Sequence, residues 1–344
     1  MLAYALTKVG IRVHVFDKSR GPGGRMASRR LEWIDRDGLS RTTSLDHGAI
    51  GLSAVTQGFQ DFIDRATRAK WLAEWTPTPA PGNLPLSEPI RLHVPVPDTP
   101  SLCRRLLSET DSTWSFAVDR LQRESSGWWI AAGDRCHEAP FDAAIVAVPP
   151  LQAAPLLSPH RSDWARGASI VSMHPCWTLI GVSDSIEPGV DWDLGRPVSG
   201  PLDWVVRNDR KPGRTRICGQ DHWVAHARPG WSRQHVEQSA SDVLTLMQAA
   251  LAEFLGQAVR WRHCTAHRWR YALPRALKNP APRSSWWDAE RGLGVCGDFF
   301  GDSGIEGAWQ SAWSLHAALL DLPRDSATPD SGLSTSQYCL NKDV

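Results

Sequence analysis

The chain has 344 residues, of which 42% are hydrophobic and 22% charged, with a formal net charge of +1. Such a chain is long enough for two domains, its composition is typical of a globular enzyme, and its charge gives no reason to expect a nucleic-acid or acidic-membrane partner. No apolar run approaches the ~18 residues of a membrane span, and no signal-peptide pattern is found. The seven cysteines form no C-x-x-C pair, which disfavours a zinc site and favours the reduced thiols of a cytoplasmic protein.

The first predicted elements are a helix over residues 2–10 and a strand over 12–16 that ends at Asp17. In a dinucleotide-binding βαβ unit, an acid at the end of the second strand holds the adenosine ribose, and the phosphate-binding glycines precede it by roughly 20 residues. Counting back from Asp17 puts those glycines at or before Met1. We therefore expect the first strand and the phosphate loop to be missing, which would leave a gap in the sheet and weaken cofactor binding.

The turn after this strand predicts half of a dinucleotide site. Asp17 can accept from both ribose hydroxyls, although a strand-end Asp can also simply cap a turn. Gly23 and Gly24 allow close approach of the backbone to a pyrophosphate, and the Arg25 guanidinium can neutralise it. Lys18 lies next to Asp17 and is included among the predicted cofactor contacts.

Further predicted elements follow in chain order. Their ranges are a helix over 57–75, a proline-rich connection over 75–100, a hairpin over 114–132, a buried strand over 141–148, antiparallel strands over 173–182 and 214–226, an amphipathic helix over 234–255, and a buried strand over 292–296. Residues from 326 onward are predicted to be disordered. The pattern predicts an α/β protein whose nucleotide domain is built from non-contiguous pieces, with a second domain inserted between them.

The strand over 292–296 leads into a second candidate constellation. It ends in Gly297-Asp298, and a helix begins near Ile305, so that its free N–H groups and positive dipole end face whatever lies beyond the strand. Gly307 and Ala308 keep its first turn thin enough for a flat cofactor. Asp298 can accept from a polyol hydroxyl, or it can be only a helix cap.

A third pattern is Asp46-His47-Gly48-Ala49. No second His or Cys stands at ligand spacing, so a loop packed against a cofactor is favoured over a metal site or a catalytic base. His263 and His267 also lack a third ligand, and their segment alternates like a strand. The 18 tryptophans of the chain fit core packing or an aromatic pocket for a flat ring.

Together these motifs resemble those of a known family. The matching segments are 13–26, 46–49, 226–232 (His-Ala-Arg-Pro-Gly-Trp-Ser), 267–272 (His-Arg-Trp-Arg-Tyr-Ala), 297–298 and 306–309 (Glu-Gly-Ala-Trp). In this order, over residues 1 to about 322, they resemble the bacterial renalase-like FAD-dependent oxidoreductases of the wider flavin amine oxidase group.

The resemblance implies a fold of the p-hydroxybenzoate-hydroxylase type. Its FAD-binding Rossmann-like domain would comprise residues 1–55, 100–155 and 285–322, and a substrate domain on a mixed or antiparallel sheet would comprise 56–99 and 156–284. Residues 323–344 would form a tail. It also implies non-covalent FAD and a small-molecule substrate: members oxidise dihydronicotinamide isomers of NAD(P)H by hydride transfer and pass the electrons to O2, giving H2O2.

The resemblance also assigns roles to residues. Asp17 would hold the adenosine ribose, Gly24 and Arg25 the pyrophosphate, and Asp298 the ribityl chain, while Val118 would contact the adenine through its backbone. The chemistry would belong to the flavin, and the candidate pocket wall is Trp231, Trp269 and Tyr271. The full set of expected cofactor contacts is Asp17, Lys18, Gly23, Gly24, Arg25, His47, Gly48, Ala49, Val118, Gly297, Asp298, Glu306, Gly307 and Ala308.

Two departures from the family keep alternatives open. The opening strand with Gly-x-Gly-x-x-Gly is absent, and Ile50-Gly51-Leu52 stands where members have a run like Gln-Tyr-Phe. The alternatives are a flavin amine oxidase or desaturase with another substrate, and a truncated chain that binds no cofactor.

Overall fold

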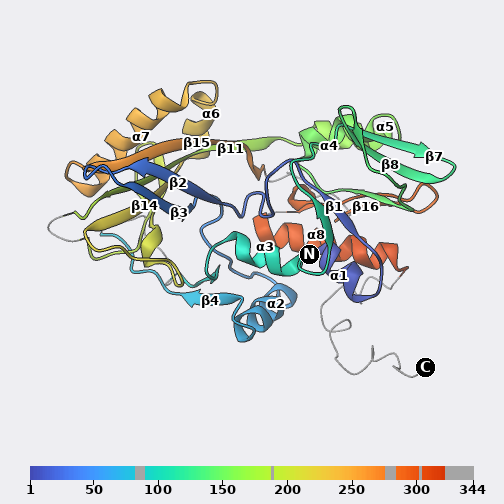
Figure 1. Cartoon of the computed structure of the whole chain (residues 1–344), viewed down its shortest axis with the longest axis horizontal. Helices are drawn as coiled ribbons and strands as arrows, with labels where there is room; N and C mark the ends of the chain where they lie inside the picture. Colours follow the sequence, from blue (N-terminus) through green and yellow to red (C-terminus); the bar gives the residue numbers. More distant parts are fainter. Residues whose placement is uncertain (82–89, 187–189, 276–283, 302–303, 322–344) are drawn as a thin grey trace.

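The computed structural model describes residues 1–81, 90–186, 190–275, 284–301 and 304–321. Figure 1 shows two lobes. One carries α6, α7 and the long strands β11, β14 and β15, and the other carries β1, β7, β8, β16, α4 and α5. The predicted tail from residue 326 lies outside the described residues.

The parallel strands form two separate sheets. Strand β1 (His14–Phe16) pairs with β6 (Asp111–Thr113), and β10 (Ala144–Val146) pairs with β17 (Leu293–Val295), both in parallel. A third strand, β16 (Trp286–Asp288), adds to β17 in the antiparallel sense. Within the described ranges, β1 and β10 are each bonded to a neighbour on one edge only. The rings of Phe16 and Phe141, just before β10, lie 5.8 Å apart, so the two sheets adjoin without being hydrogen-bonded.

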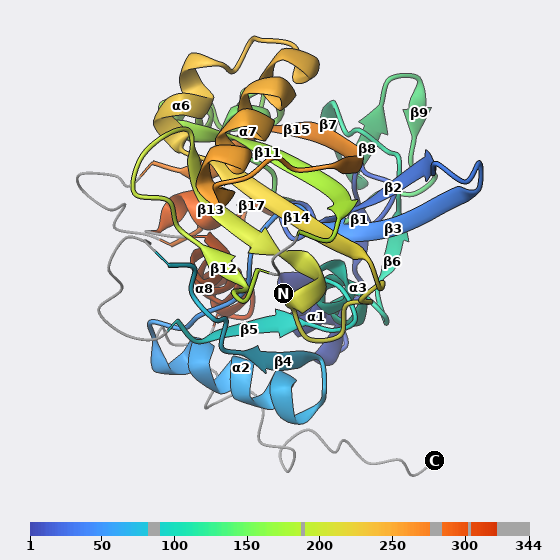
Figure 2. The ribbon, with the colours of Figure 1, turned by 90° about the vertical axis from the view of Figure 1, so that its left-hand side faces the viewer.

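The second lobe is built on a five-stranded antiparallel sheet of order β12-β13-β14-β11-β15. Its strands are β11 (Met173–Asp184), β12 (Leu194–Gly195), β13 (Leu202–Arg207), β14 (Gln220–Ala227) and β15 (Trp261–Pro274). Alternation places Trp177 and Leu179 against helix α7 (Ala240–Leu255). Ile180 and Val182 face the hairpin formed by β2 (Ser28–Ile34) and β3 (Ser40–Asp46). The sheet is therefore covered on both faces, as Figure 2 shows.

Helix α7 illustrates how local sequence sets an element's limits. The Ser239 hydroxyl accepts from the backbone N–H of Asp242 and caps the first turn, while Gly256, with φ +68°, ends the helix in the left-handed conformation. The apolar face between them, which includes Val243, Met247 and Leu251, packs on the sheet.

The remaining elements surround these sheets. They are α1 (Leu2–Lys8), α2 (Gln57–Arg68), β4 (Leu72–Trp75), β5 (Leu92–Pro95), α3 (Pro100–Leu106), β7 (Arg120–Glu124), β8 (Gly127–Ala132), β9 (Arg135–Cys136), α4 (Pro150–Leu157), α5 (Ser162–Ser169), α6 (Pro229–Gln234), α8 (Gly304–Leu319) and the short helical turns Asn208–Arg210 and Asp298–Phe300. One core joins Trp164 of α5 to Val295 and Phe299, so the core of the first lobe extends past residue 155. Another joins α2 and α3 to Trp309 of α8.

Most predicted elements are confirmed, and three differ. The helix over 57–75 ends at Arg68, because Lys70 adopts φ +59° and residues 72–75 pair with β5 as strand β4. The strand over 214–226 begins only at Gln220, after the left-handed Gly213 and Gly219. The helix over 234–255 begins only at Ala240, because Ser239 is extended and caps α7, whereas Gln234 is the last residue of α6.

Candidate functional site

Two of the predicted cofactor segments lie side by side. The backbone N–H of Ala49 donates to the Arg25 carbonyl at 2.9 Å, and that of Gly48 to the Ala27 carbonyl at 3.3 Å. A Cβ on Gly48 would lie 2.0 Å from the Arg25 carbonyl oxygen, so only glycine allows this approach. The glycine-rich turn after β1 and the loop after β3 therefore form one rigid platform.

Arg25 and Asp298 also meet, across 273 positions of sequence. The Arg25 guanidinium donates to both carboxylate oxygens of Asp298, at 2.6 and 2.7 Å, and its Nη1 also donates to the Ala272 carbonyl at 2.9 Å. A guanidinium has five N–H donors, so two remain for a ligand. Asp298 is 3% exposed, whereas Arg25 is 33% exposed and can be reached by an anion.

Asp17 lies at the carboxyl end of β1, as the ribose assignment requires. One of its carboxylate oxygens accepts from the Ser19 N–H at 2.7 Å, and the side chain is partly exposed. A cavity of about 460 Å³ opens along the turn that follows. Its lining includes Gly24, whose φ of +52° and empty surroundings leave its backbone open to a ligand.

His47 is held as a neutral ring. Burial, followed by the nearby His267 and Arg29, lowers the pKa of His47 to about 3. Its Nδ1 lies 3.1 Å from the Ala27 carbonyl oxygen, so this nitrogen carries the proton. The ring stacks on Trp269 at 4.8 Å, and the indole N–H of Trp269 donates to the His47 carbonyl at 3.2 Å. His47 therefore acts here as a packed platform residue and carries no charge at neutral pH.

A buried ionic cluster fixes the base of this platform. The Asp46 carboxylate accepts from the Ser28 hydroxyl at 2.6 Å, from Arg214 Nε at 2.9 Å, and from Lys211 Nζ at 3.5 Å. Burial raises the pKa of Asp46, but Lys211 and Arg214 outweigh it and hold that pKa far below its usual value. Burial, against the pull of Asp46, lowers the pKa of Lys211 to about 8.

Opposite this platform, strand β15 is irregular where it faces Pro175 of β11. His174 pairs with Leu273, and Cys176 pairs with Trp269. An advance of two residues along β11 therefore corresponds to four residues along β15. Proline has no N–H to offer the ladder, which favours a bulge at this point. The bulge frees the Ala272 carbonyl that Arg25 engages.

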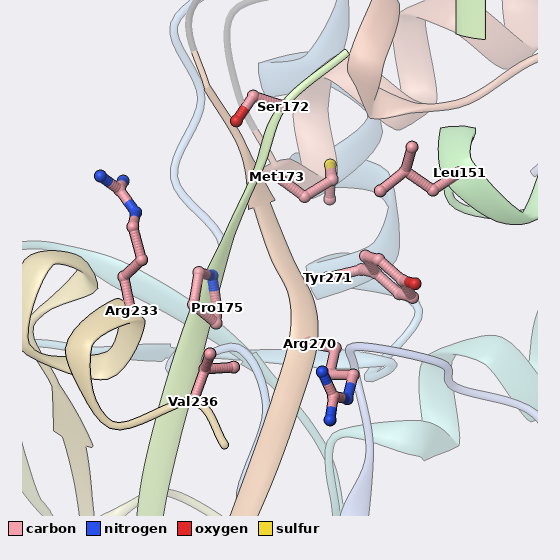
Figure 3. Close-up of a pocket in the computed structure, with 8 residues that line it drawn as sticks. All are labelled: Leu151, Ser172, Met173, Pro175, Arg233, Val236, Arg270 and Tyr271. Atoms are coloured by element: carbon pink, nitrogen blue, oxygen red, sulfur yellow. The ribbon is translucent and has the colours of Figure 1, made fainter. Parts of the chain in front are cut away.

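The bulge also builds one wall of a second cavity, of about 380 Å³, drawn in Figure 3. Of the three aromatic residues predicted to form a pocket wall, Tyr271 lines this cavity, and Trp269 and Trp231 do not. Trp269 stacks on His47, because the bulge breaks the expected alternation, and Trp231 stacks on His235 at 4.0 Å. Tyr271 points toward Leu151 of α4 in Figure 3.

The remaining residues predicted to contact the cofactor are Val118, Glu306, Lys18, Gly297, Gly307 and Ala308. Val118 precedes β7 and is not on the hairpin strand, and its N–H donates to the Phe116 carbonyl at 3.0 Å. Both Glu306 carboxylate oxygens accept from the start of α2, including the Thr56 N–H at 2.9 Å, so this side chain caps a helix. Lys18 is exposed. Gly297 leads directly into Asp298. A Cβ added at Gly307, next to partly buried Ala308, would make only ordinary contact with Asp298.

The sequence interpretation missed Lys211, Arg214 and Asn208, whose amide oxygen accepts from the Asp46 N–H at 3.1 Å. No motif marks them, because their partner is 162 or more positions away. Among the described residues no three His, Cys, Asp or Glu side chains gather as a metal site. In the same residues no helix is both long and apolar enough for a membrane crossing.

Comparison with known proteins defines the fold. Residues 1–66 match the family model of an NAD(P)-binding Rossmann-like domain. A cyclohexylamine oxidase from Brevibacterium oxydans IH-35A superposes with a TM-score of 0.63 at 12% identity, over 93% of this chain and 96% of that one. Reduced UDP-galactopyranose mutase gives 0.65 at 11% identity, over 96% and 95%.

A protein from Exiguobacterium sp. 255-15, named as a candidate protoporphyrinogen oxidase, gives a TM-score of 0.52 at 15% identity. That match covers 66% of this chain but only 52% of the other, about half its length. The chain therefore has a mixed α/β fold in which a Rossmann-like domain is joined to an antiparallel-sheet domain, in the arrangement that amine oxidases have.

Proposed function

We propose that this protein is an FAD-dependent oxidoreductase that oxidises a dihydronicotinamide substrate, with O2 as the final acceptor. The observation that carries the proposal is that Arg25, in the turn after Asp17, contacts both Asp298 and the loop at His47. Asp17 and Asp298 follow the carboxyl ends of parallel strands β1 and β17, and ligands of open α/β sheets bind at such ends.

The residues present fit a dinucleotide. Asp17 has a free carboxylate oxygen for a ribose hydroxyl, Gly24 leaves open space beside the backbone, and Arg25 keeps two N–H donors for a pyrophosphate. A polyol hydroxyl would compete with Arg25 for the Asp298 carboxylate. Cofactor binding is then expected to loosen the pair, which makes Arg25 more available to the phosphates.

We further propose that a strand and its phosphate loop lie between β1 and β10 in the active protein. The two sheets adjoin with one unpaired edge on each side, and a single parallel strand would join them into one sheet. The anion site of such a domain is the turn that follows that strand. We expect FAD to be held firmly only by a form in which such a strand and its turn are present.

When bound, FAD would supply the redox chemistry by which the substrate's hydride, together with one proton from solvent, reduces O2 to H2O2. The chain itself would contribute positioning. Asp17 would hold the adenosine ribose, Arg25 the pyrophosphate and Asp298 the ribityl chain. His47, neutral and stacked on Trp269, would offer a flat, uncharged surface. Tyr271 would hold the substrate ring in the adjoining cavity.

A second candidate is oxidation of an amine, favoured by the likeness to the cyclohexylamine oxidase. The fold does not decide between the two, because the same architecture is found in the mutase. Turnover of amines without turnover of dihydronicotinamides would favour this candidate.

The test is a visible absorption spectrum of the purified protein, as printed and with preceding residues encoded upstream of Met1. A flavin band that is strong in the extended form and lost in its Arg25→Met variant supports the proposal. Arg68→Met, an exposed change in α2, is the matched control and is expected to keep the band. If neither form holds flavin, the proposed function is wrong.

A further inference from the structure

The cavity beside the bulge of β15 carries an unusual charge pattern. Its charged lining residues are Arg233 and Arg270, and no carboxylate lines it. His174 of β11 lies next to it, and burial, followed by Arg233 and Arg275, lowers the pKa of that histidine. No acidic group among the described residues opposes these cations at His174.

The two lining arginines differ in how their charge is compensated. Arg270 is paired bidentately with Glu237, with both N–O distances at 2.8 Å. Arg233 donates from Nη2 to the Nδ1 of His174 at 2.7 Å, and this acceptor is a neutral ring. In the described part of the chain Arg233 makes no ion pair with a carboxylate, so the charge of this exposed lining residue is uncompensated.

The other lining is apolar and partly aromatic. Leu151, Met173, Pro175 and Val236 line the cavity together with Tyr271, and Figure 3 shows Leu151 and Met173 above the Tyr271 ring. The next residue, Ala272, accepts from Arg25 of the proposed cofactor site, so a ring packed on Tyr271 would lie beside that site. The cavity therefore combines a surface for a flat ring with a cationic rim.

We propose that the substrate carries a flat ring and an anionic group, a carboxylate or a phosphate, and that Arg233 is the residue that holds the anion. The proposal rests on the function proposed above and narrows its substrate class. A charge-assisted bond from a guanidinium contributes about 1.5–3 kcal/mol, or roughly ten- to a hundredfold in affinity. An ammonium group would meet repulsion here, so the cavity selects against simple amines.

The experiment uses four probes that share one ring: benzoate, phenyl phosphate, benzyl alcohol and benzylamine. Their Kd values are measured by isothermal titration calorimetry at low and high salt. At least one anion is expected to bind tenfold or more tightly than the alcohol and the amine, and to weaken with salt. The tighter of the two anions shows whether the natural group is a carboxylate or a phosphate.

Three variants test the residue itself. Arg233→Gln is expected to weaken anion binding tenfold or more, and Arg68→Gln to leave it unchanged. Glu237→Gln is expected to strengthen it severalfold, because it releases the charge of Arg270. Circular dichroism checks that each variant is folded.

The proposal is overturned if benzylamine binds as tightly as the anions, if no probe binds, or if Arg233→Gln leaves the anion Kd within twofold. The flavin spectrum of the same samples reports separately on the proposed function. A sample of the extended form without flavin that still binds an anion through Arg233 rejects that function and leaves the anion site standing.

Discussion

The buried cluster around Asp46 contains two cations and one carboxylate, which makes the consequences of single substitutions unequal. The side chains of Lys211 and Arg214 are 1% and 4% exposed, and that of Asp46 is 2% exposed. Asp46→Asn would leave both cations unpaired, and breaking a buried pair costs about 3–5 kcal/mol. Lys211→Met removes one cation and leaves a neutral pair, Asp46 with Arg214. We therefore expect Asp46→Asn to lower the free energy of unfolding by about 3–5 kcal/mol and Lys211→Met not to lower it.

The pH dependence tests the same reasoning. Because the pKa of Lys211 falls from 10.5 to about 8 on folding, the unfolded chain binds more protons between these values, and stability rises with pH there. This shift corresponds to about 3 kcal/mol, and Lys211→Met should abolish the rise. Urea unfolding of the wild type and both variants at pH 7 and pH 10 measures these differences. The reasoning is refuted if Lys211→Met is as destabilised as Asp46→Asn, or if it keeps the rise.

Three more predictions concern the platform and its support. Gly48→Ala should abolish flavin absorption in the extended form, because the new Cβ would lie 2.0 Å from the Arg25 carbonyl oxygen. Glu306→Gln should lower the free energy of unfolding by about 1–2 kcal/mol, since it weakens the cap over Thr56, and an unchanged urea midpoint would contradict this. The ring of His47 should show no NMR titration between pH 5 and 8, because its pKa lies near 3; a midpoint near 6 would show that the ring is not buried.

Local features of the sequence predicted much of the site. Asp17, Arg25 and Asp298 are recognisable because each follows a short apolar strand within about ten residues, and His47 because of the pattern Asp46-His47-Gly48-Ala49. The structure then brings their segments together, as the parallel-strand interpretation requires.

What the sequence did not predict depends on long-range contacts. Lys211 lies outside the predicted elements and Arg214 at the start of a predicted strand. Nothing local shows that both side chains reach Asp46, more than 160 positions away. The motif Glu306-Gly307-Ala308-Trp309 predicts that Glu306 contacts the cofactor. Its carboxylate instead caps α2, a helix 250 positions earlier, and no periodicity signals such a contact.

The bulge in β15 contributes to both halves of the proposed site, the cofactor side at Arg25 and the cavity at Tyr271. Pro175 cannot donate to the ladder, so β15 gains two residues opposite it, and the three residues from Arg270 to Ala272 leave the regular register. One side of this segment offers the Ala272 carbonyl to Arg25, and the other offers Tyr271 and Arg270 to the cavity. In a regular strand the Ala272 carbonyl would pair with the neighbouring strand, and the side chains would alternate between the two faces. Such a strand could not both bind Arg25 and line the cavity with Tyr271 and Arg270. The position of one proline within an apolar strand thus determines that the proposed cofactor anchor and the proposed substrate cavity lie one residue apart.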